Sequence, residues 1–72
     1  FVFENEPLEG VLKKLERWYN ITVFIQNQRL KQMRFTGNLP KYENINNVLN
    51  ILALTTNIKF ELNDRTLVVQ LE

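Results

Sequence analysis

The chain has 72 residues and a net charge of +1 at pH 7, from nine Lys and Arg against eight Asp and Glu, and it contains neither Cys nor His. This length predicts one domain, and without Cys the chain has no disulfide and no thiolate metal site. Since His and Cys supply the commonest general base, metal ligand and thiolate nucleophile, we expect no enzyme and no cofactor, and the small net charge argues against nucleic acid as a partner.

The N-terminal segment predicts a strand followed by an amphipathic helix. Phe1–Phe3 is apolar and β-prone, and Pro7 suits the first turn of a helix, where its missing N–H is not needed. From Leu8 onward six apolar residues fall within one helical arc of about 120°. This pattern predicts a helix over residues 7–19.

Two further strands follow, separated by a polar connection. Ile21–Ile25 is rich in β-branched and aromatic residues, which favours a strand. Polar residues 26–29 predict a turn, after which Leu30 plugs the core. Met33–Thr36 alternates between apolar and polar residues, which predicts a strand, and Gly37–Pro40 predicts a loop.

The C-terminal half predicts a helix and a hairpin. Asn44 is a good N-cap for a helix over residues 45–55. The alternating segments Ile58–Leu62 and Thr66–Leu71 predict strands. Because Asn63–Arg65 between them has the chemistry of a turn, we expect an antiparallel hairpin.

An internal repeat with an offset of 37 residues relates the two halves. Leu8, Val11, Leu12 and Leu15 recur as Ile45, Val48, Leu49 and Leu52. Each half is a strand, a helix and a strand, and one half is too small to fold alone. We therefore expect an α+β fold in the order β-α-β-β-α-β-β, with two βαβ-like halves and two helices packed between or against small sheets.

The second predicted helix lies in a segment without charge. Residues 44–58 contain no charged side chain, and Ile51 and Leu54 project well away from the predicted buried stripe. Burial of the helix on two sides is the favoured explanation. The alternative is a partner-binding patch made by Ile51 and Leu54 together with Asn47 and Asn50.

The βαββαβ order within the chain is shared with RNA-recognition domains. Those domains carry aromatic residues on an exposed sheet face beside basic residues, in a Lys/Arg-Gly-Phe/Tyr-like run. The nearest segment, Met33–Gly37, has its Gly in another position and only one aromatic residue. RNA binding is therefore a remote alternative.

A longer pattern extends over almost the whole chain. It consists of Phe3-x-Asn5-x-Pro7-Leu8-x-x-Val11-Leu12-x-x-Leu15-x-x-Trp18-Tyr19-Asn20, then Arg34-Phe35-Thr36-Gly37, Asn44-Ile45-x-x-Val48-Leu49-x-x-Leu52, Leu54-Thr55-Thr56 and Ile58-Lys59-Phe60. In these residues the chain resembles the C-terminal domain of FecR-family anti-sigma regulators of the Bacteroidetes type. The Arg-Phe-Thr-Gly and Leu-Thr-Thr segments are the most specific.

The resemblance implies a fold and a function. The fold is that of the secretin/TonB short N-terminal domain, in which two helices lie between two small sheets and the second helix is buried on two sides. The function is a non-catalytic protein-interaction domain in the periplasm. Such a domain receives a signal from the signalling domain of a TonB-dependent outer-membrane receptor.

The resemblance also implies parts that lie outside these residues. Because the chain begins with Phe1 and not with Met, we expect residues 1–72 to be the C-terminal domain of a longer, membrane-anchored protein. Its N-terminal part would bind an extracytoplasmic-function sigma factor, and a transmembrane helix would link the two parts. The alternative is the short N-terminal signalling domain of a TonB-dependent receptor.

Two segments supply candidate partner-binding residues. Arg34 and Thr36 point away from the apolar face of their predicted strand, although pairing of Arg34 with a carboxylate and of Thr36 with a strand ladder is the favoured explanation. The last strand is the candidate sheet edge, where a partner adds a strand. Its candidate residues are Thr66, Val68 and Gln70.

Overall fold

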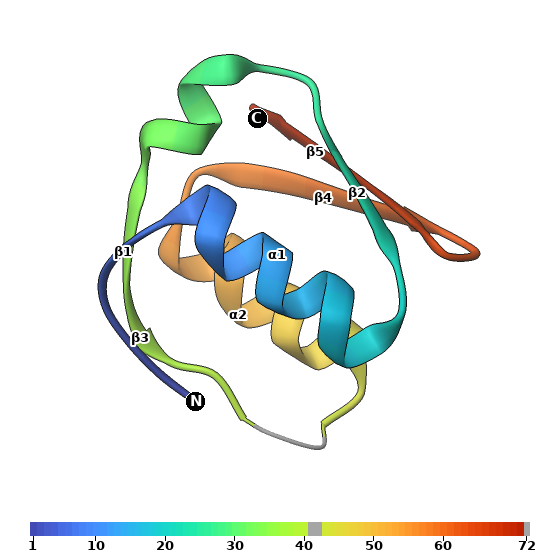
Figure 1. The fold of residues 1–72 in the computed structure, drawn as a ribbon, viewed down its shortest axis with the longest axis horizontal. Coiled ribbons are helices and arrows are strands. Elements are labelled where there is room, and N and C mark those ends of the chain that lie inside the picture. Colours follow the sequence, from blue (N-terminus) through green and yellow to red (C-terminus); the bar gives the residue numbers. More distant parts are fainter. Residues whose placement is uncertain (41–42, 72) are drawn as a thin grey trace.

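The computed structural model describes residues 1–40 and 43–71. The elements are β1 (Val2–Pro7), α1 (Leu8–Tyr19), β2 (Thr22–Ile25), the 3₁₀ helix η1 (Gln28–Gln32), β3 (Arg34–Asn38), α2 (Ile45–Thr55), β4 (Ile58–Asn63) and β5 (Thr66–Leu71). The predicted α+β class is confirmed. Figure 1 shows the β1–β3 pair on one flank of the helices and a sheet of β2, β4 and β5 on the other.

β5 is the central strand of the three-stranded sheet, so the prediction that residues 66–71 form a sheet edge is wrong. The strand order is β2-β5-β4, with β5 antiparallel to β4 and parallel to β2. The hairpin with β4 is as predicted. The second neighbour comes from the first half of the chain, where Thr22 N donates to Arg65 O at 2.7 Å and Gln26 N to Val69 O at 3.1 Å.

Helix α1 follows the predicted pattern closely. It begins at Leu8, directly after Pro7, and ends at Tyr19. Asn20 then adopts a left-handed conformation with φ of 54° and donates its N–H to Glu16 O, which closes the helix end. Leu8, Val11, Leu12 and Leu15 of the apolar stripe are buried because they face the core, whereas Trp18 at its end is 36% exposed and Tyr19 is partly buried.

The elements around β3 differ from the prediction in three places. β1 continues to Pro7 and does not stop after Phe3, and β3 runs from Arg34 to Asn38, which includes the first two residues of the predicted loop. The extension of β3 pairs with the start of β1, with Gly37 opposite Phe3 and Asn38 opposite Val2, and the extension of β1 pairs with Phe35 and Arg34. This pairing overrides the turn propensity of the Gly and Asn residues. The predicted turn before Leu30 is a 3₁₀ helix, and Leu30 is fully buried as expected.

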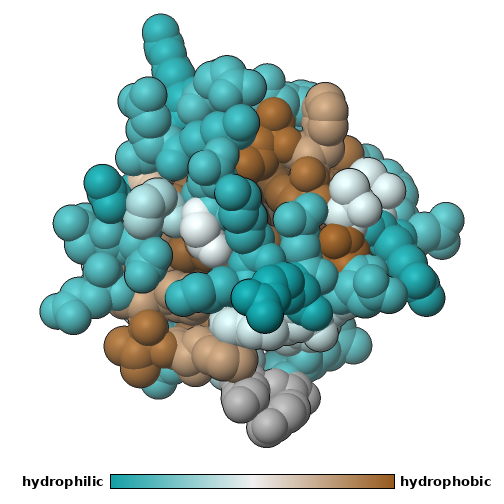
Figure 2. Space-filling model, viewed as in Figure 1, coloured by the Kyte–Doolittle hydropathy of each residue, from teal (hydrophilic) through white to brown (hydrophobic). Residues whose placement is uncertain are grey.

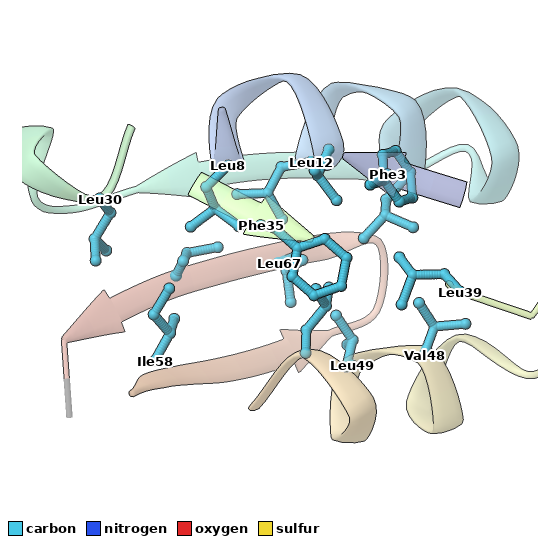
Figure 3. Packing of buried hydrophobic residues seen from close by; sticks show 14 residues of the cluster. Phe3, Leu8, Leu12, Leu30, Phe35, Leu39, Val48, Leu49, Ile58 and Leu67 are labelled. Atoms are coloured by element: carbon cyan, nitrogen blue, oxygen red, sulfur yellow. The ribbon is translucent and has the colours of Figure 1, made fainter. Parts of the chain in front are cut away.

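The core is shared by both halves of the chain, as the repeat predicts. Figure 3 shows α1 and α2 on opposite sides of the buried side chains. The strands are exchanged between the halves, since β1 pairs with β3 and β2 pairs with β5. No polar or charged side chain is buried among the residues that the structure describes.

Helix α2 is open on its outer side. Asn44 caps it, with its side-chain oxygen accepting from Asn46 N at 2.8 Å. Ile51 is partly buried against the core, whereas Leu54 is 86% exposed. The prediction that this helix is buried on two sides is therefore wrong at Leu54, because the flanking sheets do not cover the outer face of the helix.

Candidate partner-binding surface

Arg34 and Thr36 hold a bulge in the neighbouring strand. The β1–β3 register shifts between Phe3 and Glu6, and Asn5 in this bulge has φ of 51°. Thr36 Oγ1 accepts from Asn5 N at 2.9 Å, and Arg34 Nη1 donates to Asn5 O at 3.0 Å. Both side chains therefore satisfy main-chain groups of one irregular residue, Asn5. The partner of Arg34 is a carbonyl and not the expected carboxylate.

Gly37 makes room for the ring of Phe35. A Cβ at position 37 would lie 2.9 Å from Phe35 Cζ, which is closer than carbon atoms pack. Phe35 is buried, and its ring centroid lies 5.9 Å from that of Phe3. The Arg-Phe-Thr-Gly segment is thus explained by contacts inside the domain, and a part in partner binding for Arg34 or Thr36 stays a prediction.

The three candidates on β5 lie on the outer face of the other sheet. Leu67 and Val69 of β5 are fully buried, so Thr66, Val68 and Gln70 alternate with them and face outward. The structure therefore does not bring these three residues together with Arg34 and Thr36. It does place Val68 in register with Phe24 of β2, which is 58% exposed.

A groove runs between α1 and the outer edge of β2. Its volume is about 340 Å³, and Leu12, Val23, Phe24 and Ile25 give it an apolar lining. Charged side chains of Glu9, Lys13, Glu16 and Lys31 also line it. Figure 2 shows hydrophobic side chains exposed between polar ones on this face of the molecule.

The main chain of β2 offers hydrogen-bonding groups to this groove. Since Thr22 and Gln26 direct their N–H groups to β5, the alternation of a strand directs those of Val23 and Ile25 to the opposite edge. Val23 N donates to Glu16 Oε2 at 2.8 Å. The Glu16 carboxylate of α1 thus accepts the hydrogen bond that the carbonyl of an added neighbouring strand would otherwise accept.

The charged groups at the groove form one ion pair. Lys31 Nζ lies 3.5 Å from Glu9 Oε2, and both side chains are more than a third exposed. Such an exposed pair contributes little stability, on the order of 0–1 kcal/mol. It does not close the groove against a partner.

Sequence reasoning missed this groove although one signal was present. Ile21–Ile25 carries no charge, and Phe24 interrupts the alternation of apolar and polar residues that is expected of a strand with one solvent-exposed face. Such a run is typical of a strand with apolar contacts on both faces. Which edge of β2 stays open depends on the pairing with β5, which no local pattern gives.

Other chemical features are sparse. Among residues 1–40 and 43–71 no group of three His, Cys, Asp or Glu side chains is placed to hold a metal ion. No helix in the described part of the chain is long and apolar enough to cross a membrane. Burial, and secondarily the negative charge of Glu43, raise the pKa of Tyr19 above its ordinary value of 10.0.

Comparison with known proteins identifies a family and a fold. The family model described as FecR, C-terminal, matches residues 1–69. A crystal structure of a candidate anti-sigma factor from Parabacteroides distasonis ATCC 8503 matches the whole of this chain with a TM-score of 0.85 and 21% sequence identity. The chain spans only 34% of that protein, so the likeness shows the fold. No curated protein matches the chain.

Proposed function

The chain belongs to the FecR C-terminal family, and from this premise we propose that it is the periplasmic receiver domain of a transmembrane anti-sigma regulator. It binds the signalling domain of a TonB-dependent outer-membrane receptor. A transmembrane helix and an N-terminal part, both outside these residues, carry the signal to an extracytoplasmic-function sigma factor. The domain performs no catalysis; its work is binding.

The observation that carries this proposal is the groove beside the open edge of β2. An extended segment of the receptor domain adds to β2 as a fourth strand of the sheet, which is a common way for domains to bind peptides. The main-chain groups of Ile25 supply hydrogen bonds, and the exposed ring of Phe24 supplies an apolar anchor.

The central position of β5 moves the docking site away from the last strand. Because β5 already has a strand on each side, no partner strand pairs with it. Val68 still contributes, since it lies beside Phe24 on the outer face of the sheet. Thr66 and Gln70 flank it on the same face and form the rim of the proposed contact.

Calorimetric titration with a purified receptor signalling domain encoded near the gene tests the proposal. We expect Phe24→Ser to weaken binding by at least about tenfold, as the loss of an interface anchor does. Leu54→Ser is the matched control, because it removes an exposed apolar side chain from α2. Normal binding by Phe24→Ser, with binding lost in the control, would place the contact elsewhere.

The family match favours the regulator over a receptor's own short N-terminal domain, since the matching model describes the regulator family. Nothing in the match favours RNA binding. The gene itself separates the first two cases, because a regulator encodes a membrane helix upstream of this domain and a receptor encodes a plug and barrel downstream.

A further inference from the structure

β4 is the second open edge of the three-stranded sheet. Among the described residues it pairs with β5 alone. Ile58, Phe60 and Leu62 face the core side of the sheet, and Lys59 and Glu61 are exposed on the other side. The two charges are opposite in sign and lie symmetrically about Phe60.

We propose that β4 pairs antiparallel with β4 of a second copy of this chain, about a two-fold axis at Phe60. In this register Lys59 of each copy lies opposite Glu61 of the other, so the pairing makes two attractive cross-strand pairs. The two Phe60 rings lie opposite each other, and Ile58 of one copy lies opposite Leu62 of the other. The charge pattern of β4 is thus complementary to itself, and the product is one continuous six-stranded sheet.

The helix beside β4 suits this contact. A groove of about 300 Å³ separates α2 from β4, with Leu49, Ala53 and Phe60 in its apolar lining and Asn46 and Asn50 on its α2 side. The second copy's β4 brings its own Phe60 and Leu62 to this groove. The exposed amides of α2 are neutral, so the second copy approaches without desolvating charge.

This contact accounts for part of the uncharged segment that the domain's own packing leaves unexplained. Residues 44–58 carry no charge in a chain of which 24% is charged, yet much of the outer face of α2 is exposed. Depletion of charge is the compositional mark of interface cores. A second copy at β4 covers part of this face.

The other edge of the sheet lacks this self-complementarity. β2 carries no charged residue, and Glu16 of α1 already occupies the N–H of Val23. A β2–β2 pairing would therefore bring no attractive charges into register. Pairing through β4 leaves the groove beside β2 open, so this inference does not depend on the proposed receptor contact.

Sedimentation equilibrium from micromolar to millimolar concentration tests the proposal with charge-swapped variants. We expect the wild-type chain to form dimers whose dissociation constant rises with salt. Lys59→Glu or Glu61→Lys alone replaces both attractions by repulsions and weakens the dimer by at least about tenfold. An equimolar mixture of the two variants recovers dimers, because each supplies the charges that the other needs.

Lys13→Glu on α1 is the matched control, and we expect it to dimerise like the wild type. Circular dichroism checks that every variant is folded. A wild-type chain that stays monomeric at all concentrations overturns the proposal. So does a mixture of Lys59→Glu and Glu61→Lys that associates no better than either variant alone.

Discussion

Replacement of Glu16 by Ala tests the proposed opening of the β2 edge, because it changes stability and binding in opposite directions. In the wild type, Glu16 Oε2 accepts from Val23 N at 2.8 Å. A partner strand that pairs with β2 must displace this carboxylate. Glu16→Ala removes the bond from the unbound domain and leaves the edge ready for the partner.

The magnitude follows from the kind of hydrogen bond. A bond to a charged group contributes about 1.5–3 kcal/mol when it is well buried. Glu16 is only partly buried, so we expect Glu16→Ala to lower the free energy of unfolding by about 1 kcal/mol. In the wild type, binding of the partner must break this hydrogen bond, which costs the same free energy. Glu16→Ala has no such bond to break, so we expect its affinity for the receptor domain to be about fivefold higher than that of the wild type.

Urea unfolding measures the first change and calorimetric titration measures the second. Glu4→Ala is the control, because Glu4 is an exposed carboxylate of β1, in the other sheet. We expect this control to leave both quantities near their wild-type values. Loss of affinity in Glu16→Ala would refute the reasoning, because it would show that the carboxylate contacts the partner and does not compete with it.

Three further expectations concern the domain itself. Gly37→Ala should lower the free energy of unfolding by about 1–3 kcal/mol in urea titration, because the new Cβ meets the buried ring of Phe35 at 2.9 Å; unchanged stability would contradict that contact. In the same assay Gly10→Ala should raise the free energy of unfolding by up to about 1 kcal/mol, because Ala favours a helix and the new Cβ meets only Glu6 Oε2 at an ordinary 3.5 Å. A lower free energy of unfolding would contradict this and show that the site has no room for a methyl group. The pKa of Tyr19 is raised above 10.0 in the folded state, so its contribution to stability is complete below pH 10 and is lost as pH rises through the folded pKa. Thermal melts across this pH range should show a steeper fall of the melting temperature for the wild type than for Tyr19→Phe. Equal slopes would contradict the raised pKa.

The sequence predicted those parts of the fold that depend on local periodicity. Both helices were placed within a residue of their ends, because a 3.6-residue stripe and an Asn cap are local signals. The hairpin of β4 and β5 was equally accessible, since turn residues separate two alternating segments. Leu30 was recognised as a core residue by its isolation within a polar stretch.

The strand order was not accessible from local pattern. β2 and β5 are more than 40 residues apart in the sequence. Their parallel pairing depends on the tertiary packing that places Val23 and Ile25 against the shared core. This pairing turned the expected edge strand into a central one. The roles of Arg34 and Thr36 were likewise hidden, because they depend on a bulge at Asn5 in another strand.

Amide hydrogen exchange of Ile25, measured by NMR with and without the receptor signalling domain, tests the central claim most directly. The N–H of Ile25 points away from β5, so partner-strand addition at β2 should slow its exchange in the complex. We expect this protection together with unchanged exchange at Arg34–Gly37. Protection confined to the Arg34–Gly37 segment, with Ile25 unaffected, would contradict the account.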